Sequence, residues 1–227
     1  MDIQEIVSKY DLPEKDELRE LLFEVITTLN SEPVELRPPD STDSPGGLVQ
    51  PSEFLSSARA SIIVPDLHAR VDFFTQIFDF ILPDDVTGKK NITVKEALAD
   101  KKIFVICVGD GFHGERRALL RWLEAEYEWL TGNILSDAMC REMRENLALM
   151  KLVMKAKKDY PHCFHFLKGN HENILNGFVK GNYPFRKFVS EGEMVKNFMQ
   201  AVYGKKLIYE YADFEYKLPL FVQGSNF

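Results

Sequence analysis

Apolar residues recur at helical spacing near the start of the chain and then give way to a stretch without periodicity. Residues 31–47 are rich in Pro, Ser, Asp and Gly, which predicts a linker or long loop. We therefore divide the chain into an N-terminal helical extension with its linker, residues 1–51, and a second domain, residues 52–227. The predicted helix of the extension has an apolar face made of Leu18, Leu21, Leu22, Val25, Ile26 and Leu29.

From about residue 52, short apolar runs alternate with amphipathic helical patterns, which is typical of an α/β domain. Three runs are β-rich, short and continuous, so we expect strands buried on both faces at 61–64, 103–108 and 163–167. Helices are predicted between the second and third strands, at about 115–130 and 137–158. The methionine-rich face of the longer helix and the tryptophans of the shorter one indicate core packing rather than a cofactor surface.

The composition limits the class of protein. The chain has 227 residues, of which 45% are hydrophobic, enough for one sizeable core. Its formal net charge of −7 gives no electrostatic footprint for nucleic acid or an anionic membrane. No stretch reaches the roughly 20 uncharged apolar residues that span a bilayer, and no apolar signal core is present, so we expect a cytoplasmic protein. The cysteines lack metal-binding spacing and are interpreted as buried free thiols: Cys107, Cys140 and Cys163.

Residue types that bind metals follow each of the three predicted strands. The motifs are Pro-Asp-Leu-His at 65–68, Gly-Asp-Gly at 109–111 and Gly-Asn-His-Glu at 169–172. Because the carboxyl ends of neighbouring strands meet at one edge of an α/β sheet, these side chains can converge. Asp, His and Asn donors suit Mn, Fe or Zn, and a carboxylate can bridge two such ions. Each motif alone is weak, but the ordered set predicts a metal cluster.

With this ordered set, residues 60–227 resemble the calcineurin-like metallophosphoesterases and are similar to their phosphoprotein phosphatase branch. The segment 203–207, followed by Phe214 and by Leu-Pro-Leu at 218–220, adds to the resemblance. The resemblance implies an α/β fold built on a β-sandwich flanked by helices. It also implies two divalent metal ions and hydrolysis of phosphate monoesters by a metal-bound hydroxide, with phosphoproteins as a candidate substrate class.

The resemblance also implies roles for individual residues. Asp66 and His68 would bind the first metal, and Asn170 would bind the second. Asp110 would bridge both ions, which places it among the catalytic residues as well. His171 would be the general acid that protonates the leaving alkoxide.

The second motif departs from the family's GDxxDRG, because residues 109–117 read GDGFHGERR. The acid that orients the catalytic histidine and the arginine that binds phosphate are therefore missing from their usual places. Glu115 is a candidate for the carboxylate. Arg116 and Arg117, at the start of a predicted helix, are candidates for binding substrate phosphate, with a solvated helix face as the alternative. His113 is placed with this substrate group, with an ordinary loop residue as the alternative.

No histidine follows His171, although the family takes two or three further ligands from its C-terminal half. Gln223 is a candidate replacement, but it lies only three residues past Leu220, which is too short a spacing. We prefer a hairpin turn at 224–226, after which the chain stops before its missing ligands. We therefore expect a truncated or incomplete domain, with an apolar face left uncovered where the second sheet would pack.

Three functional hypotheses follow. The leading one is a dinuclear phosphoesterase. The first alternative is a catalytically inactive, phosphatase-like binding module, which the weakened second motif and the absent histidines favour. The other is a nucleotide phosphodiesterase, which would share the metal site and differ in its pocket.

Overall fold

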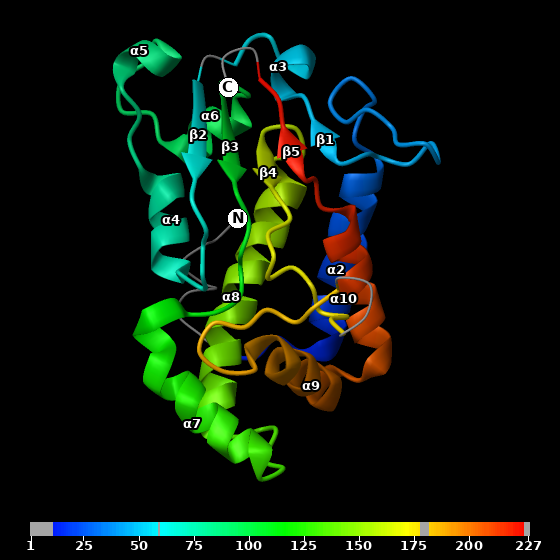
Figure 1. The fold of residues 1–227 in the computed structure, drawn as a ribbon. Helices are drawn as coiled ribbons and strands as arrows, with labels where there is room; N and C mark the ends of the chain where they lie inside the picture. Colours follow the sequence, from blue (N-terminus) through cyan, green and yellow to red (C-terminus); the bar gives the residue numbers. More distant parts are fainter. Residues whose placement is uncertain (1–10, 59, 178–181, 225–227) are drawn as a thin grey trace.

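A parallel sheet forms the core of the protein. The computed structural model describes residues 11–58, 60–177 and 182–224. The sheet has the order β2-β3-β4, with β2 at Ala60–Val64, β3 at Ile103–Cys107 and β4 at Phe164–Phe166. All three strands run in the same direction, so their carboxyl ends lie at one edge of the sheet, toward the lower half of Figure 1. The predicted α/β class is confirmed, and the predicted β-sandwich stays a prediction.

Burial differs between the three strands of the sheet. Every residue of β3 and β4 is buried, as the continuous apolar runs predict. In β2, by contrast, Ile63 is 53% exposed. The prediction that this first strand is buried on both faces is therefore wrong: within β2 only Val64 is buried. Edge position alone does not account for this, because β4 lies at the other edge of the sheet and is buried.

Helices fill both crossover connections. After β2 come α4 (Val71–Asp79), α5 (Asp84–Thr87) and α6 (Val94–Ala99), and after β3 come the 3₁₀ turn η1 (Glu115–Ala118), α7 (Leu119–Leu130) and α8 (Asp137–Asp159). The side chain of Ser136 caps α8 by accepting the Met139 N–H at 3.3 Å. α8 runs behind the sheet in Figure 1 and turns its methionine face into the core, which confirms the predicted packing role. Trp122 of α7 is fully buried, whereas Trp129 is half-buried.

The C-terminal part consists of two helices and a short strand. α9 (Glu191–Tyr203) and α10 (Lys205–Lys217) meet at Gly204, whose φ of 82° favours glycine. β5 (Phe221–Val222) then pairs in parallel with β1 (Leu48–Val49), which precedes α3 (Pro51–Phe54). Next to this pairing, Gln223 Oε1 accepts a hydrogen bond from Gln50 at 3.2 Å. The predicted hairpin turn at 224–226 lies mostly outside the described residues.

The helix near the start of the described chain packs into the same core as the sheet. α2 (Lys15–Asn30) confirms the predicted helix, and its apolar face joins one hydrophobic cluster with α8 and α10. The predicted linker after it is irregular but anchored. Glu32, which is buried, pairs with Arg37 at 2.9 Å and with Lys157, while Arg37 also donates to the Gly46 carbonyl oxygen at 2.6 Å. Each buried charge is thus compensated by a partner.

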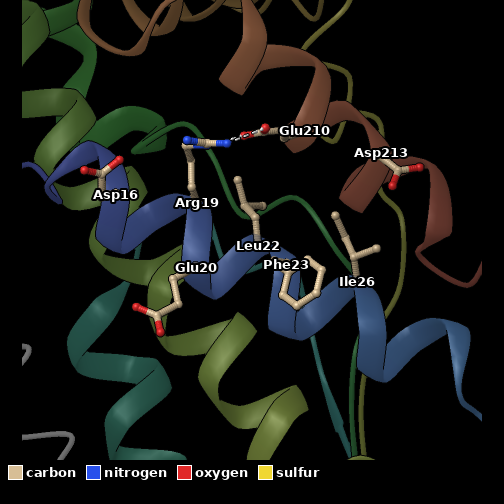
Figure 2. Close-up of a pocket in the computed structure, with 8 residues that line it drawn as sticks. All are labelled: Asp16, Arg19, Glu20, Leu22, Phe23, Ile26, Glu210 and Asp213. Atoms are coloured by element: carbon tan, nitrogen blue, oxygen red, sulfur yellow. Dashed lines mark hydrogen bonds and ion pairs between the residues drawn. The ribbon is translucent and has the colours of Figure 1, made fainter.

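A pocket of about 520 Å³ lies between α2 and α10 (Figure 2). Across it, Arg19 donates two hydrogen bonds to the carboxylate of Glu210, at 3.0 and 3.2 Å. Phe23 at its rim is 73% exposed. The residues that follow the parallel strands do not line this pocket.

The sequence expectations on thiols and membrane spans also have a structural outcome. Cys107 and Cys163 are buried, Cys140 is half-buried, and all three are free. Burial raises the pKa of the Cys163 thiol to about 11. Over the described part of the chain, no helix has the length and apolar character needed to cross a bilayer.

Candidate metal centre

The loops that leave β2 and β3 run side by side and continue the parallel pairing of the strands. His68 N–H donates to the Asp110 carbonyl oxygen at 2.8 Å, and Ala69 N–H donates to the Gly111 carbonyl oxygen, also at 2.8 Å. These bonds fix the first two predicted ligand motifs against each other. Backbone hydrogen bonds therefore already hold the first two ligand loops together, as expected from the parallel sheet.

Glu172 joins the third loop to the second. Its carboxylate accepts the backbone N–H groups of Asp110 at 2.9 Å, Gly111 at 2.8 Å and Gly169 at 2.7 Å. Burial raises the pKa of Glu172 to about 7, although the three N–H donors favour the ionised form. Gly169 permits this close approach, because a Cβ there would lie 2.1 Å from Asp110 Oδ1.

Backbone strain is concentrated at these loops. The described chain has eight non-glycine residues with positive φ, and five of them lie here. Left-handed backbone at such residues costs about 1–3 kcal/mol each and persists where the surroundings hold it in place, commonly at functional sites. The strain therefore marks the same loops that the sequence motifs indicate. The five are His68, Ala69, Asp110, His113 and Glu115.

One backbone carbonyl fixes the tautomer of two histidines. The Phe112 oxygen lies 3.0 Å from Nδ1 of His171 and 3.4 Å from Nδ1 of His68. Because a carbonyl oxygen only accepts, we assign the proton of both neutral rings to Nδ1, which leaves the Nε2 lone pairs available. Nε2 of His68 lies 3.9 Å from Asp66 Oδ2, and Nε2 of His171 lies 4.0 Å from Asp110 Oδ2.

The structure brings Asp66, His68 and Asp110 together. One ligand atom from each lies within 4.8 Å of the other two. Two carboxylates and a neutral imidazole suit a borderline divalent cation such as Mn, Fe or Zn, so the donor set fits the ion that the motifs imply. Asp110 is buried and Asp66 is exposed, which leaves this group open to solvent on one side. Asn170 is exposed beside His171 in the third loop, and its role as a ligand stays a prediction.

The ring of His171 is held on its face as well as at its edge. Phe185, in the segment before α9, stacks on it with ring centroids 4.1 Å apart and planes 9° apart. Burial lowers the pKa of His171, opposed by the negative charge of Asp110. The ring is therefore neutral near pH 7, with Nε2 directed at Asp110.

The three predicted substrate-binding residues lie in different environments. Arg117 donates to the carbonyl oxygens of Ala69 at 2.8 Å and His68 at 3.2 Å, and it pairs with Glu145. Arg116 is exposed. His113 is fully buried against Trp122, with ring centroids 5.2 Å apart. Binding of substrate by these residues stays a prediction.

Glu115, the candidate for the carboxylate that orients His171, lies at the centre but contacts His68 and Lys187. Glu115 Oε1 lies 3.3 Å from His68 Nε2 and also meets Lys187 Nζ, whose hydrogen bond lowers the pKa of Glu115. The carboxylate nearest His171 Nε2 is instead that of Asp110.

Some residues at the centre were not foreseen from the sequence. Lys187, Phe185 and Glu191 come from a segment more than 65 residues beyond the second motif, which carries no recognisable pattern. Glu172 lies inside the third motif, but its spacing gave no sign that it would bind backbone amides.

No protein-family model and no curated protein sequence matches the chain. One solved structure that it resembles is that of a protein serine/threonine phosphatase from Saccharomyces cerevisiae, described as similar to human phosphatase PP5. The two are 14% identical with a TM-score of 0.48, and the match covers 95% of this chain and 46% of that one. This chain therefore spans about half the length of that protein. Since the TM-score is low, the proposed function rests on the site.

Proposed function

We propose that this chain carries the metal-binding part of a phosphoesterase that hydrolyses phosphate monoesters. The observation that supports it is the convergence of Asp66, His68 and Asp110, from loops after two neighbouring strands, with the Nε2 lone pair of His68 directed into the group. His171 lies beside them, since its ring centroid is 5.2 Å from that of His68. Carboxylates, imidazoles and a nearby general acid are the groups that metal-assisted hydrolysis requires.

Each residue has a task in this proposal. Asp66, His68 and Asp110 hold a divalent cation, and Asn170 contributes to a second. Such cations supply Lewis acidity, activation of water and neutralisation of charge on the phosphoryl oxygens.

His171 acts as the general acid. Its Nδ1–H is retained by the Phe112 carbonyl, so the ring must first take up a proton at Nε2, and it is this proton that it transfers to the leaving oxygen. Its lowered pKa makes it a ready donor once protonated. Arg116, exposed at the start of the 3₁₀ turn, is our candidate for contacting the phosphate.

Phosphoproteins are the substrate class that we favour. We also propose that the fold of the active phosphoesterase is a β-sandwich. A β-sandwich would supply a second sheet and further ligands beyond those that the described residues contribute.

A specific observation favours the second candidate, an inactive phosphatase-like binding module. Arg117, a candidate for binding phosphate, already donates to two backbone carbonyl groups and pairs with Glu145. The Glu115 carboxylate likewise pairs with Lys187. Both side chains would have to break these contacts before they could take part in substrate binding or catalysis.

An assay with an aryl phosphate and Mn²⁺ separates the two candidates. If the chain is a phosphoesterase, hydrolysis depends on the metal and a chelator abolishes it. Asp110→Asn should reduce the rate by at least about 100-fold, because Asp110 is the proposed ligand of both metal ions. Glu124→Gln, a surface substitution on α7, is the matched control and should leave the rate unchanged. Metal binding without hydrolysis of any phosphoester tested would instead support the binding module.

A further inference from the structure

We propose that His68, His113 and Glu115 form a cation position of their own, which takes one divalent ion of borderline softness such as Zn²⁺. Of these residues only His68 belongs to the metal ligands of the proposed function. The inference concerns metal binding alone, so it stands or falls separately from phosphoester hydrolysis. A two-histidine, one-carboxylate set is a common arrangement for zinc in proteins.

The ligand atoms of the three side chains are close enough to share an ion. They lie within 4.8 Å of one another, and His68 Nε2 is 3.3 Å from Glu115 Oε1. With bonds of about 2.0–2.2 Å, tetrahedral zinc ligands stand roughly 3.4 Å apart. One pair already has this separation, so the remaining approach is a movement of side chains rather than of strands.

The hydrogen bonds of His113 place its lone pair on Nδ1, the nitrogen next to Glu115. Its Nδ1 accepts the Glu115 backbone N–H at 3.2 Å, and its Nε2 lies 3.3 Å from Glu191 Oε1. The proton of His113 therefore sits on Nε2. A carboxylate that accepts the far N–H of an imidazole is the usual support for a metal-binding histidine.

His68 has a matching support on its far side. Its Nδ1 faces the Phe112 carbonyl oxygen at 3.4 Å, so both imidazoles hold their protons away from Glu115. The backbone strain falls on the same three residues, with φ of 43° at His68, 81° at His113 and 58° at Glu115. The three residues whose ligand atoms lie within 4.8 Å of one another are thus all held in left-handed backbone.

Two contacts compete with a metal ion for this position. The Lys187 ammonium pairs with the Glu115 carboxylate, and the Glu115 N–H occupies Nδ1 of His113. An ion must displace both. Lys187 is a partly exposed side chain on a flexible stem, so its removal should favour the ion rather than weaken it.

The position also competes with the group described above, because the two share His68. The Nε2 lone pair of His68 binds one ion at a time. Zn²⁺, which favours imidazole, is expected at His68, His113 and Glu115, whereas Mn²⁺, which favours carboxylates, is expected at Asp66 and Asp110.

Calorimetric titration of the full chain with Zn²⁺ tests the proposal. Glu115→Gln should weaken the tightest Zn²⁺ by at least about 100-fold, and Glu191→Gln by roughly 10-fold to 100-fold because it supports His113. Lys187→Ala should tighten binding, while Asp66→Asn and the surface control Glu124→Gln should leave it within about twofold. Absorption of bound Co²⁺ gives an independent reading of histidine ligation.

Opposite results would overturn the inference. These are a wild-type chain that binds no Zn²⁺, or binding that Asp66→Asn removes and Glu115→Gln preserves. Circular dichroism shows whether each variant is folded. If Glu115→Gln does not fold, the Zn²⁺ affinity of Lys187→Ala decides. The proposal predicts tighter Zn²⁺ binding in this variant, whereas an ion pair with a purely structural role predicts no gain in Zn²⁺ affinity.

Discussion

Glu172, in the loop after β4, accepts the backbone N–H of Asp110, in the loop after β3, at 2.9 Å. The same carboxylate holds Gly111 and Gly169, so one buried side chain sets the relative position of two loops of the metal centre. The carboxylate therefore acts on the site through the backbone.

Removal of the Glu172 carboxylate should destabilise the fold. Glu172→Ala leaves three backbone N–H groups without their acceptor in a buried place, at about 1–3 kcal/mol for each group that water does not reach. We expect a loss of at least about 3 kcal/mol in the free energy of unfolding, measured by urea denaturation. Glu124→Ala on the surface of α7 should change it by less than about 0.5 kcal/mol. Equal losses in the two variants would contradict the role given to Glu172.

Gly169 should tolerate no side chain. A Cβ there would lie 2.1 Å from Asp110 Oδ1 and 2.6 Å from the Asp110 backbone nitrogen, so Gly169→Ala must displace the ligand loop. We expect the affinity for Mn²⁺ to fall by at least about tenfold. Gly177→Ala is the control, since nothing lies within 4 Å of the added carbon there. Unchanged Mn²⁺ affinity in Gly169→Ala would show that the two loops move independently.

Phe185 should govern the titration of His171. Burial lowers the pKa of His171, and Phe185 covers one face of its ring. In Phe185→Ala the ring gains access to water, so its pKa should rise toward the ordinary value near 6.5. Proton NMR of the metal-free chain measures it. Phe23→Ala, in the pocket of Figure 2, should leave the His171 titration unchanged. A lower pKa in Phe185→Ala would contradict the desolvation argument.

The N-terminal helix should unfold together with the sheet. Leu22 of α2 is buried in the common core, whereas its neighbour Phe23 is exposed. Leu22→Ala should cost about 2–5 kcal/mol, and Phe23→Ala less than about 0.5 kcal/mol, in a single thermal transition followed by circular dichroism. A separate early transition for α2 in the wild-type chain would mean that the extension folds on its own.

His165 should make the protein less stable in mild acid. Burial lowers its pKa well below the ordinary value, so the ring is neutral in the folded chain and takes up a proton only when the chain unfolds. Above about pH 6.5 the ring is neutral in both the folded and the unfolded chain, so it causes no change of unfolding free energy with pH. Below that value the unfolded chain binds a proton that the folded chain does not, and the unfolding free energy falls. The wild-type chain should therefore lose more unfolding free energy than His165→Asn between pH 7.5 and pH 5. Parallel losses in the two proteins would contradict this assignment.

The sequence was most informative where periodicity is strong. The apolar runs predicted β3 and β4 because both are buried on each face, and the helical repeats predicted α2 and α8. The same runs located β2 but misjudged its burial, since an apolar segment does not reveal whether both faces of its strand are covered. The ligand motifs were readable because they follow strands, and the sheet itself brings them together.

Contacts between distant segments were not readable. Glu191 reaches His113 because α9 packs near α7, a tertiary relationship with no local signal. The pairing of β1 with β5 spans only two residues in each strand, too few to leave an alternating pattern. The segment 31–47 has the composition of a loop, yet two contacts with distant residues fix it to the core: Glu32 pairs with Lys157, and Arg37 donates to the Lys217 carbonyl oxygen.

The most direct test of the metal centre is a crystal of the chain grown with Mn²⁺ and measured at a wavelength where manganese scatters anomalously. The account predicts a peak bonded to the carboxylates of Asp66 and Asp110, at about 2.2 Å from an oxygen of each, with His68 Nε2 as a further ligand. A peak elsewhere, or none at these three residues, would contradict it.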